Sequence, residues 1–517
     1  MPLARDVSTV GGGTLMSRLL AFFRDAWIAA LLGAGPFSEA FFAVLQFVNF
    51  FRRLLAEGAL NSAFIPIWLK LREGKDGQAN ADLFTRRSLM AMFCITGSIA
   101  LLVILLAPVV TATIAPGFDE GRHKLAGFFL AIAAPYIALA GLVAVIAAAL
   151  NAEGRVGAVA LSTALFNVVM LAALFLLLGE RTQFAISTWL IGAVVAAASV
   201  QLGVTAVAWL TTGKRLSRAH VRVPDQTFTF FTRAAPGLIA AGIPQLKLIA
   251  AAAVASSSPA AVAWLYYANR LYELPLGVAS IAIAAVIVPH IANSLRAGAA
   301  DSAAAQSRAF ELALGLALPA TTGFAVLAEP IASGLFQRGA FGAGDTAAVA
   351  AALTAICAGL PGHVLDKVFG AVSFAHEDTH TPMLTALASL ATAIVLAILL
   401  FPHFGHVGVA AAIAISGWVG ASLLGIILYQ RCWLRLDPEA GRNLLRILLA
   451  TAVMGGIVIA GSLARSRLSP ALATSSLGRI AALAILVPLG GATYVFALEI
   501  LGVTKIKDLI GALRGRD

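Results

Sequence analysis

The stretch SRLLAFFRDAWIAALLGAG, residues 17–35, is apolar enough to lie in a membrane, and yet it carries charged side chains. Arg18, Arg24 and Asp25 interrupt a run of leucine, alanine, phenylalanine and isoleucine. An arginine at the centre of a bilayer costs about 2.5–3.5 kcal/mol on insertion scales, so charged residues at this depth usually mark a functional path. The stretch predicts a membrane-spanning helix that contributes to a polar site.

Similar apolar stretches recur along all 517 residues, of which 60% are hydrophobic and only 12% charged. A run of about 20 apolar residues crosses a ~30 Å hydrocarbon layer as a helix, and these runs are too long for barrel strands. The sequence predicts an all-α polytopic membrane protein with about 14 spans, near residues 8–33, 38–69, 86–114, 124–150, 156–179, 185–211, 234–256, 261–293, 307–336, 346–375, 383–401, 407–430, 444–464 and 480–502.

Lysine and arginine are distributed unevenly between alternate loops. About twenty of them lie in one set of loops, which includes KLREGKDG, KRLSRAHVR and the C-terminal KIKDLIGALRGRD, and about seven lie in the other set. Basic loops face the cytoplasm, so both termini are expected there. The net charge of +11 is then explained by orientation and anionic lipid, and no nucleic-acid partner is expected because no basic stripe interleaves with aromatic residues.

The chain contains an internal repeat with an offset near 223 residues. LLAPVVTATIAPGFDE resembles LAEPIASGLFQRGAFGAGD, and three prolines have counterparts: Pro66 with Pro289, Pro108 with Pro330, and Pro135 with Pro361. Six spans per repeat make the two halves parallel in the membrane. We expect two pseudo-symmetric six-helix lobes, residues 1–222 and 223–436, followed by residues 437–517 with two further helices, a cytoplasmic tail and a candidate groove for a lipid tail.

Charged residues gather on the faces of particular spans. Spacings of three and four place Asn49, Arg52, Arg53 and Glu57 on one helical face. A second stripe contains Tyr266, Asn269, Arg270, Glu273 and Gly277. A third group contains His363, Asp366 and Lys367.

Two interpretations of these stripes stay open. Each arginine could pair with a nearby acid, as the spacing of Arg53 with Glu57 and of Arg270 with Glu273 allows, and charges near the span ends could snorkel. Alternatively, because basic residues exceed acids in these spans, they could line a hydrated cationic cleft for an anionic head group, which arginine grips with two parallel hydrogen bonds.

Motifs of catalysis and metal binding are missing from the sequence. It contains no G-x-S-x-G, H-E-x-x-H or P-loop pattern. Cys94, Cys357 and Cys432 lie far apart and read as small buried apolar residues, and the eight histidines do not cluster at ligand spacing. We therefore expect a transporter with no enzyme activity, no cofactor and no metal site.

The residues in these stripes resemble those of the MurJ (MviN) family, the lipid II flippases of bacterial cell-wall synthesis within the MOP exporter superfamily. The resemblance is dense in SRLLAFFRDAWIAALLGAGPFSEAFF and NFFRRLLAEGALNSAFIPIW, and it continues at WLYYANRLYELPLGV, LFQRGAF and EDTHTP. It implies two lobes that rock between inward-open and outward-open states, moving lipid II from the cytoplasmic to the periplasmic leaflet of the inner membrane.

The resemblance also implies a substrate cavity. The family's cavity arginines fall on Arg18, Arg24, Arg52 and Arg270, and they imply a site for the pyrophosphate and sugar, while the undecaprenyl tail stays in lipid beside the last two helices. The other cavity positions implied or suggested by spacing are Asp25, Glu39, Asn49, Arg53 and Glu57, with Tyr266, Asn269, Glu273, Lys247 and Lys367 as further candidates.

Two positions depart from the family pattern. Glu39 stands where the family usually has an aspartate, so the charge is kept on a side chain one methylene longer. Some relatives hold sodium between the seventh and eleventh spans, but here the seventh carries Lys247 and no acid, so we expect no sodium site of that kind. Lys247 either supplies the fixed positive charge or snorkels.

Other functions remain alternatives. Within the superfamily these are an exporter of another lipid-linked oligosaccharide and a drug antiporter, both disfavoured by the FFRRLLAEG stripe. A non-transporting scaffold for wall synthesis is a third, although a scaffold does not need arginines at bilayer depth. The expected partners are lipid II, membrane lipids and, as candidates, proteins of cell-wall synthesis or division.

Overall fold

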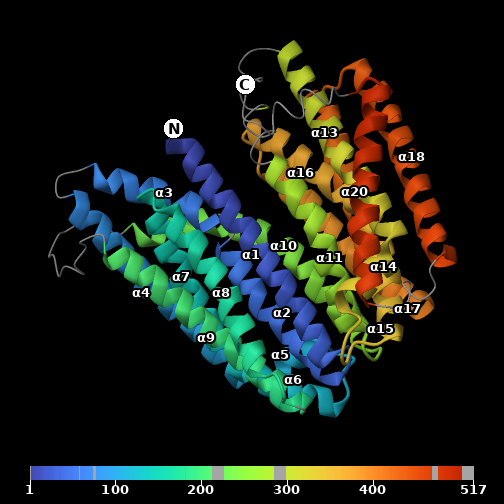
Figure 1. The fold of residues 1–517 in the computed structure, drawn as a ribbon. Helices are drawn as coiled ribbons and strands as arrows, with labels where there is room; N and C mark the ends of the chain where they lie inside the picture. Colours follow the sequence, from blue (N-terminus) through green and yellow to red (C-terminus); the bar gives the residue numbers. More distant parts are fainter. Residues whose placement is uncertain are drawn as a thin grey trace. The chain divides into compact units, whose positions relative to one another are not determined.

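A computed structural model describes residues 2–56, 59–73, 77–180, 182–211, 226–283, 291, 299–468 and 476–503. Helices make up the fold, and no strand occurs in these ranges. The chain divides into two compact units, residues 1–263 and 264–517. Each unit is an assembly of helices that follow one another along the chain (Figure 1). The expected all-α architecture is confirmed.

The first unit contains eleven labelled helices, the last of which begins at its end. Their bounds are α1 Pro2–Leu32, α2 Pro36–Ala56, α3 Ala59–Arg72, α4 Gly77–Leu105, α5 Ala107–Ile114, α6 Glu120–Ala133, α7 Pro135–Ala152, α8 Val156–Leu176, α9 Gln183–Leu210, α10 Thr227–Ala255 and α11 Ala261–Ala282. Its core includes the rings of Phe64, Phe84 and Phe230, from α3, α4 and α10, with centroids 4.9–6.0 Å apart. Helix α10 thus packs within the first unit.

The second unit takes most of α11 and the helices that follow. These are α13 Ala299–Val326, α14 Ala328–Phe336, α15 Ala343–Cys357, α16 Leu360–Ala375, α17 His380–Gln430, α18 Pro438–Leu468 and α20 Ser476–Ile500. Helices α13, α18 and α20 pack side by side around Ile447, Met454 and Tyr494 (Figure 1). Helices α18 and α20, the last two in the described ranges, therefore pack on this unit through α13 and α14.

Ten stretches of the described chain are long and apolar enough to cross a membrane. Helix α17 has 51 residues, but Gly405, with φ 55° and ψ −139°, breaks it into two parts, and Ser389 of the first part donates to the carbonyl oxygen of Ser416 in the second. It accounts for two of the expected spans. Large apolar side chains such as Leu105, Leu176 and Trp189 are exposed, as expected where lipid covers the surface. The protein is a multi-pass membrane protein.

Breaks within spans occur at the repeated prolines. Helix α5 begins after Leu106 (φ −102°, ψ 19°), with Pro108 in its first turn. Helix α14 begins after Leu327 (φ −100°, ψ 14°), with Pro330 in its first turn. A proline lacks the N–H that would continue the preceding helix, so the chain bends at both places. The repeated sequence thus gives the same local geometry in each unit.

Candidate functional site

Arg24 and its neighbours form a buried polar cluster between α1 and α8. Arg24 is 6% exposed and Asp25 fully buried. Arg24 donates from Nε and Nη2 to Asp25 Oδ1, at 2.9 and 2.8 Å, and from Nη1 to Asn167 Oδ1 at 3.0 Å. Asn167 Nδ2 in turn donates to the carbonyl oxygen and the hydroxyl of Ser17, both at 3.1 Å. These bonds offset the cost of burying the charge and hold α1 against α8.

The cationic stripe of α2 lies within Pro36–Arg72, a stretch long and apolar enough to cross a membrane. Arg52 and Arg53 are both half-buried, and Arg52 Nε donates to Asn49 Oδ1 at 3.2 Å, one turn earlier. Arg18 on α1 is also half-buried. Glu57 lies outside the described residues, so its expected pairing with Arg53 stays a prediction. The predicted stripe therefore places at least two guanidinium groups within the first unit at partly buried positions.

Glu39 lies in the first turn of α2 and is 1% exposed. Its Oε2 accepts from Arg122 Nη1 at 3.0 Å, and its Oε1 accepts from the backbone N–H of Val262 at 3.4 Å. Arg122 also donates from Nε to Asp119 at 2.8 Å, and hydrogen bonds from the backbone N–H and guanidinium of Arg122 lower the pKa of the Asp119 carboxyl. Glu39 thus joins the starts of α2, α6 and α11.

The stripe of α11 contains a local ion pair. Arg270 Nη1 lies 2.9 Å from Glu273 Oε2, with both side chains about one quarter exposed, and Asn269 Nδ2 donates to Glu273 Oε1 at 3.3 Å. The pairing suggested by the spacing of three is confirmed. Tyr266 on the same helix is half-buried, with its ring centroid 5.9 Å from that of Tyr267. Arg270 belongs to the second unit, so its convergence with Arg18, Arg24 and Arg52 stays a prediction.

The remaining candidates lie on α10 and α16. Lys247 is half-buried on α10, whereas Lys367 is exposed on α16. His363 Nδ1 lies 2.9 Å from the Tyr272 hydroxyl and 3.0 Å from the carbonyl oxygen of Gly359. Among the described residues no group of three or more histidine, cysteine, aspartate and glutamate side chains has an arrangement able to hold a metal ion.

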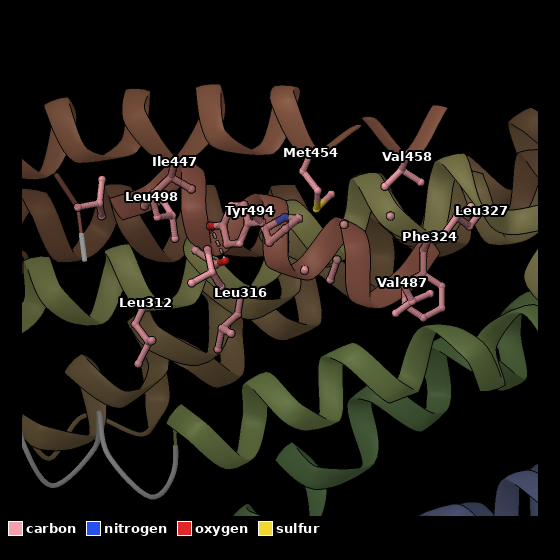
Figure 2. Close-up of a pocket in the computed structure, with 18 of the residues that line it drawn as sticks. Leu312, Leu316, Phe324, Leu327, Ile447, Met454, Val458, Val487, Tyr494 and Leu498 are labelled. Carbon is pink, nitrogen blue, oxygen red and sulfur yellow. Dashed lines mark hydrogen bonds between the residues drawn. The ribbon is translucent and has the colours of Figure 1, made fainter. Parts of the chain in front are cut away.

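An apolar groove of about 660 Å³ lies between α13, α18 and α20 of the second unit (Figure 2). Its lining runs from Arg308 on α13 to Leu327, which directly follows α13, roughly 29 Å at 1.5 Å per residue and close to the thickness of a hydrocarbon layer. Side chains such as Leu316 and Val487 make most of the groove apolar. The exceptions are Arg308 and Glu311 at one end and the hydroxyl of Tyr494, which donates to the carbonyl oxygen of Gly315 at 2.7 Å.

The polar end of the groove is fixed by a short chain of hydrogen bonds. Asn443 Nδ2 donates to Glu311 Oε1 at 2.9 Å, and Arg446 Nη1 donates to Asn443 Oδ1 at 3.1 Å. The groove therefore has one charged end and an apolar body, as an amphipathic lipid requires.

Sequence reasoning missed three polar residues of the first unit: Asn167, Arg122 and Tyr136. Asn167 is a lone amide in the otherwise apolar middle of α8, and a buried amide needs partners, so its isolation was a usable signal. Arg122 follows the Asp119 cap of α6 by three residues, but its pairing with Glu39 spans 83 positions and has no local signature.

Comparison with known proteins gives consistent matches over most of the chain. The sequence profile of the family described as "Lipid II flippase MurJ" matches residues 28–481. A protein of Rhizobium tropici named "Probable lipid II flippase MurJ" is 34% identical over 509 residues, covering 97% of this chain and 95% of that protein. One of Rhizobium meliloti (strain 1021) with the same name is 37% identical over 460 residues, covering 88% and 86%.

Solved structures show the same fold. "Lipid II flippase MurJ, inward closed conformation" matches with a TM-score of 0.78 at 21% identity, covering 97% of this chain and 99% of that one. An inward-facing multidrug resistance MATE family transporter of the MOP superfamily matches with a TM-score of 0.67 at 15% identity, covering 80% and 94%.

The fold and the apolar helices together define a multi-pass α-helical membrane protein, whose fold is shared with MurJ and with a MATE family transporter. Within that class, the profile match and the two rhizobial relatives decide the assignment. The chain belongs to the lipid II flippase MurJ family, a family of transporters.

Proposed function

We propose that this protein moves lipid II, the undecaprenyl-pyrophosphate-linked precursor of peptidoglycan, from the cytoplasmic to the periplasmic leaflet of the bacterial inner membrane. The observation that carries the proposal is the burial of arginines in helices of a membrane protein: Arg24 is buried, and Arg52 and Arg270 are partly buried. Buried charge in such helices is costly unless a function retains it, and guanidinium is well matched to phosphate oxygens. Membership of the family supports the same substrate.

In this proposal the cationic residues bind the head group, and alternating access of the two lobes carries it across. The proposed contacts come from Arg18, Arg24, Arg52 and Arg270, with Asp25, Glu39, Asn49, Arg53 and Glu57 shaping the cavity. Arg18, Arg52 and Arg270 are half-buried, whereas Arg24 is buried and three of its N–H groups bond to Asp25 and Asn167. Its loss therefore affects helix packing as well as binding, so Arg52 and Arg270 are the sharper tests.

The groove between α13, α18 and α20 is the proposed path of the undecaprenyl tail. Its apolar body lets the tail stay out of water while the head moves, and burial of apolar surface contributes about 25 cal/mol per Å². Other MOP proteins that export drugs or other lipid-linked sugars remain the alternative class. The match to a MATE transporter shares the fold alone.

The decisive measurement is transport by the purified protein in vesicles that contain lipid II. Wild-type protein is expected to expose lipid II in the opposite leaflet, whereas Arg270→Ala and Arg52→Ala are expected to insert normally and lose transport. Arg→Lys at the same positions is expected to restore it only in part, because lysine lacks the planar fork. In cells, depletion is expected to accumulate lipid II on the cytoplasmic face. Full complementation by both alanine variants at native expression would refute the site.

The groove can be filled selectively at two glycines. A Cβ added at Gly323 or Gly491 meets no atom within 4 Å, and both residues line the groove. Gly323→Leu and Gly491→Leu are expected to reduce transport without unfolding the protein. Gly456→Leu on α18 is the matched control, because its Cβ also meets open space but Gly456 does not line the groove. Equal transport by all three variants would exclude the groove as the tail path.

A further inference from the structure

Tyr136 has a buried hydroxyl with no hydrogen-bond partner among the described residues. The residue follows Pro135 at the start of α7 and is 1% exposed. Its ring packs edge-to-face on Phe166 of α8, with centroids 6.1 Å apart. A buried hydroxyl without a partner loses its hydrogen bonds to water and gains none in return, so most buried polar groups have partners. Phenylalanine would fill the same space without this cost.

The surroundings of this hydroxyl are cationic. Phe166, on which the Tyr136 ring packs, directly precedes Asn167, which accepts a bond from Arg24 Nη1 at 3.0 Å. Helix α7 also packs against α2, the helix of Arg52. Within the described residues, the bonds from Arg24 to Asp25 and Asn167 use three of its five N–H donors. Three helices, α1, α2 and α7, thus bring two positive charges and one hydroxyl donor to the same region of the first unit.

We propose that Tyr136 is a further substrate-contacting residue, whose hydroxyl donates a hydrogen bond to a phosphate oxygen of the substrate beside Arg24 and Arg52. This inference rests on the proposed function and adds a residue to its site. An anionic oxygen is the acceptor that two neighbouring guanidinium charges favour, and a hydrogen bond to a charged group is stronger than one to a neutral group. Asn167 is a positioning residue, because it fixes Arg24 through Nη1.

The test is Tyr136→Phe in the full chain, with two measurements. The affinity for lipid II is expected to fall about tenfold, the loss of one hydrogen bond to a charged acceptor. The melting temperature of the ligand-free protein is expected to stay unchanged or rise, because the removed hydroxyl has no protein partner there. With shorter probes, the variant is expected to bind undecaprenyl pyrophosphate more weakly than wild type and undecaprenol equally well.

Tyr272→Phe is the matched stability control, because the Tyr272 side chain is also buried but its hydroxyl contacts His363. Its ligand-free melting temperature is expected to fall. Wild-type affinity in Tyr136→Phe would overturn the inference, and so would a loss of stability without a loss of affinity. If both fall, a double-mutant cycle with Arg52→Gln decides: non-additive affinities support the shared phosphate, and additive ones overturn it. Wild-type protein that fails to bind lipid II would instead refute the proposed function, and this inference with it.

Discussion

Asp25 neutralises the buried charge of Arg24 on α1. Its Oδ1 accepts two bonds from Arg24, and neither residue is accessible to more than 6%. A buried ion pair contributes little net stability relative to an apolar pair, but removing one partner leaves an uncompensated charge. The acid is therefore required because the arginine is present, and the arginine is the residue that needs a functional explanation.

Asp25→Asn is expected to destabilise the protein by about 3 kcal/mol or more, because Arg24 then lacks its counter-charge. Thermal unfolding in detergent measures the effect. Glu120→Gln is the control, since the Glu120–Lys124 pair lies 75–83% exposed and a surface pair contributes at most about 1 kcal/mol. Equal melting temperatures for the two variants would show that the buried pair is not needed for stability.

Asp378, in the motif EDTHTP, gives a pH-dependent contribution outside the membrane spans. Burial alone would raise the pKa of its carboxyl, but hydrogen bonds from the Thr381 hydroxyl and backbone N–H, from Arg431 and from the backbone of His380 outweigh burial and lower it to about 2. The stabilisation is complete above the unfolded value near ~3.9 and disappears as the pH falls towards 2.

Asp378→Asn is accordingly expected to lower the melting temperature at pH 5 to 7, with the difference from wild type shrinking as the pH falls from about 4 to 2. Thermal unfolding across this range measures the difference. A gap that is independent of pH would show that the carboxylate charge contributes nothing and that only the hydrogen-bond geometry matters.

Whether the partner of a charged residue could be predicted depended on how far apart the two residues lie in the sequence. The Arg270–Glu273 pair could be predicted from a spacing of three on one helix. The bonds from Arg24 to Asn167 and from Arg122 to Glu39 join positions 143 and 83 apart, and only the packing of helices brings them together. Charged side chains could thus be located from sequence, whereas their distant partners could not.

At the scale of helices, apolar spans with a local sequence signal could likewise be found from the sequence, whereas the breaks within them and the packing of one helix on another could not. Pro108 and Pro330 were paired as repeat counterparts, but the sequence predicted continuous spans at 86–114 and 307–336, whereas the structure breaks the helix after Leu106 and after Leu327. The close packing of α16 on α17 was also not predicted, because it depends on which small residues face each other. A Cβ on Gly362 would lie 2.8 Å from the backbone nitrogen of Trp418, so the two helix backbones approach closely.

Gly362→Ala is expected to lower the melting temperature, because its methyl group would meet backbone atoms that cannot move alone. Gly370→Ala, on the same helix, is the control: its Cβ would meet only the ring of Phe374 at 3.9 Å, and alanine favours helix by about 1 kcal/mol over glycine. The control is expected to be neutral or stabilising. A neutral Gly362→Ala would contradict the close approach.

At the scale of the whole molecule, we propose that residues 1–222 and 223–436 are two parallel repeats, followed by residues 437–517. The equivalent breaks at α5 and α14 support the proposal. The first compact unit extends to residue 263 because α10 packs on α2 and α3, so compactness and the sequence repeat divide the chain at different places. Superposing the six spans of each repeat tests it, and a mismatch in helix order or direction would refute it.

Both termini are expected to face the cytoplasm, because the basic loops alternate with loops poor in lysine and arginine. A reporter that is active only in the periplasm, fused after Asp517, is expected to be inactive. The same reporter inserted in the poorly charged loop near Gly405 is the positive control and is expected to be active. Activity after Asp517 would reverse the predicted orientation.

Helix α17 also has a consequence for how the chain enters the membrane during synthesis. Its 51 residues contain no aspartate, glutamate, lysine or arginine, and Gly405 is the non-helical residue at which they turn back. Moving a lysine or arginine across the bilayer is what normally opposes translocation of a loop. This turn has no such charge to carry, so the two passes can leave the translocon together as one hairpin, without waiting for a neighbouring helix to shield a polar connection.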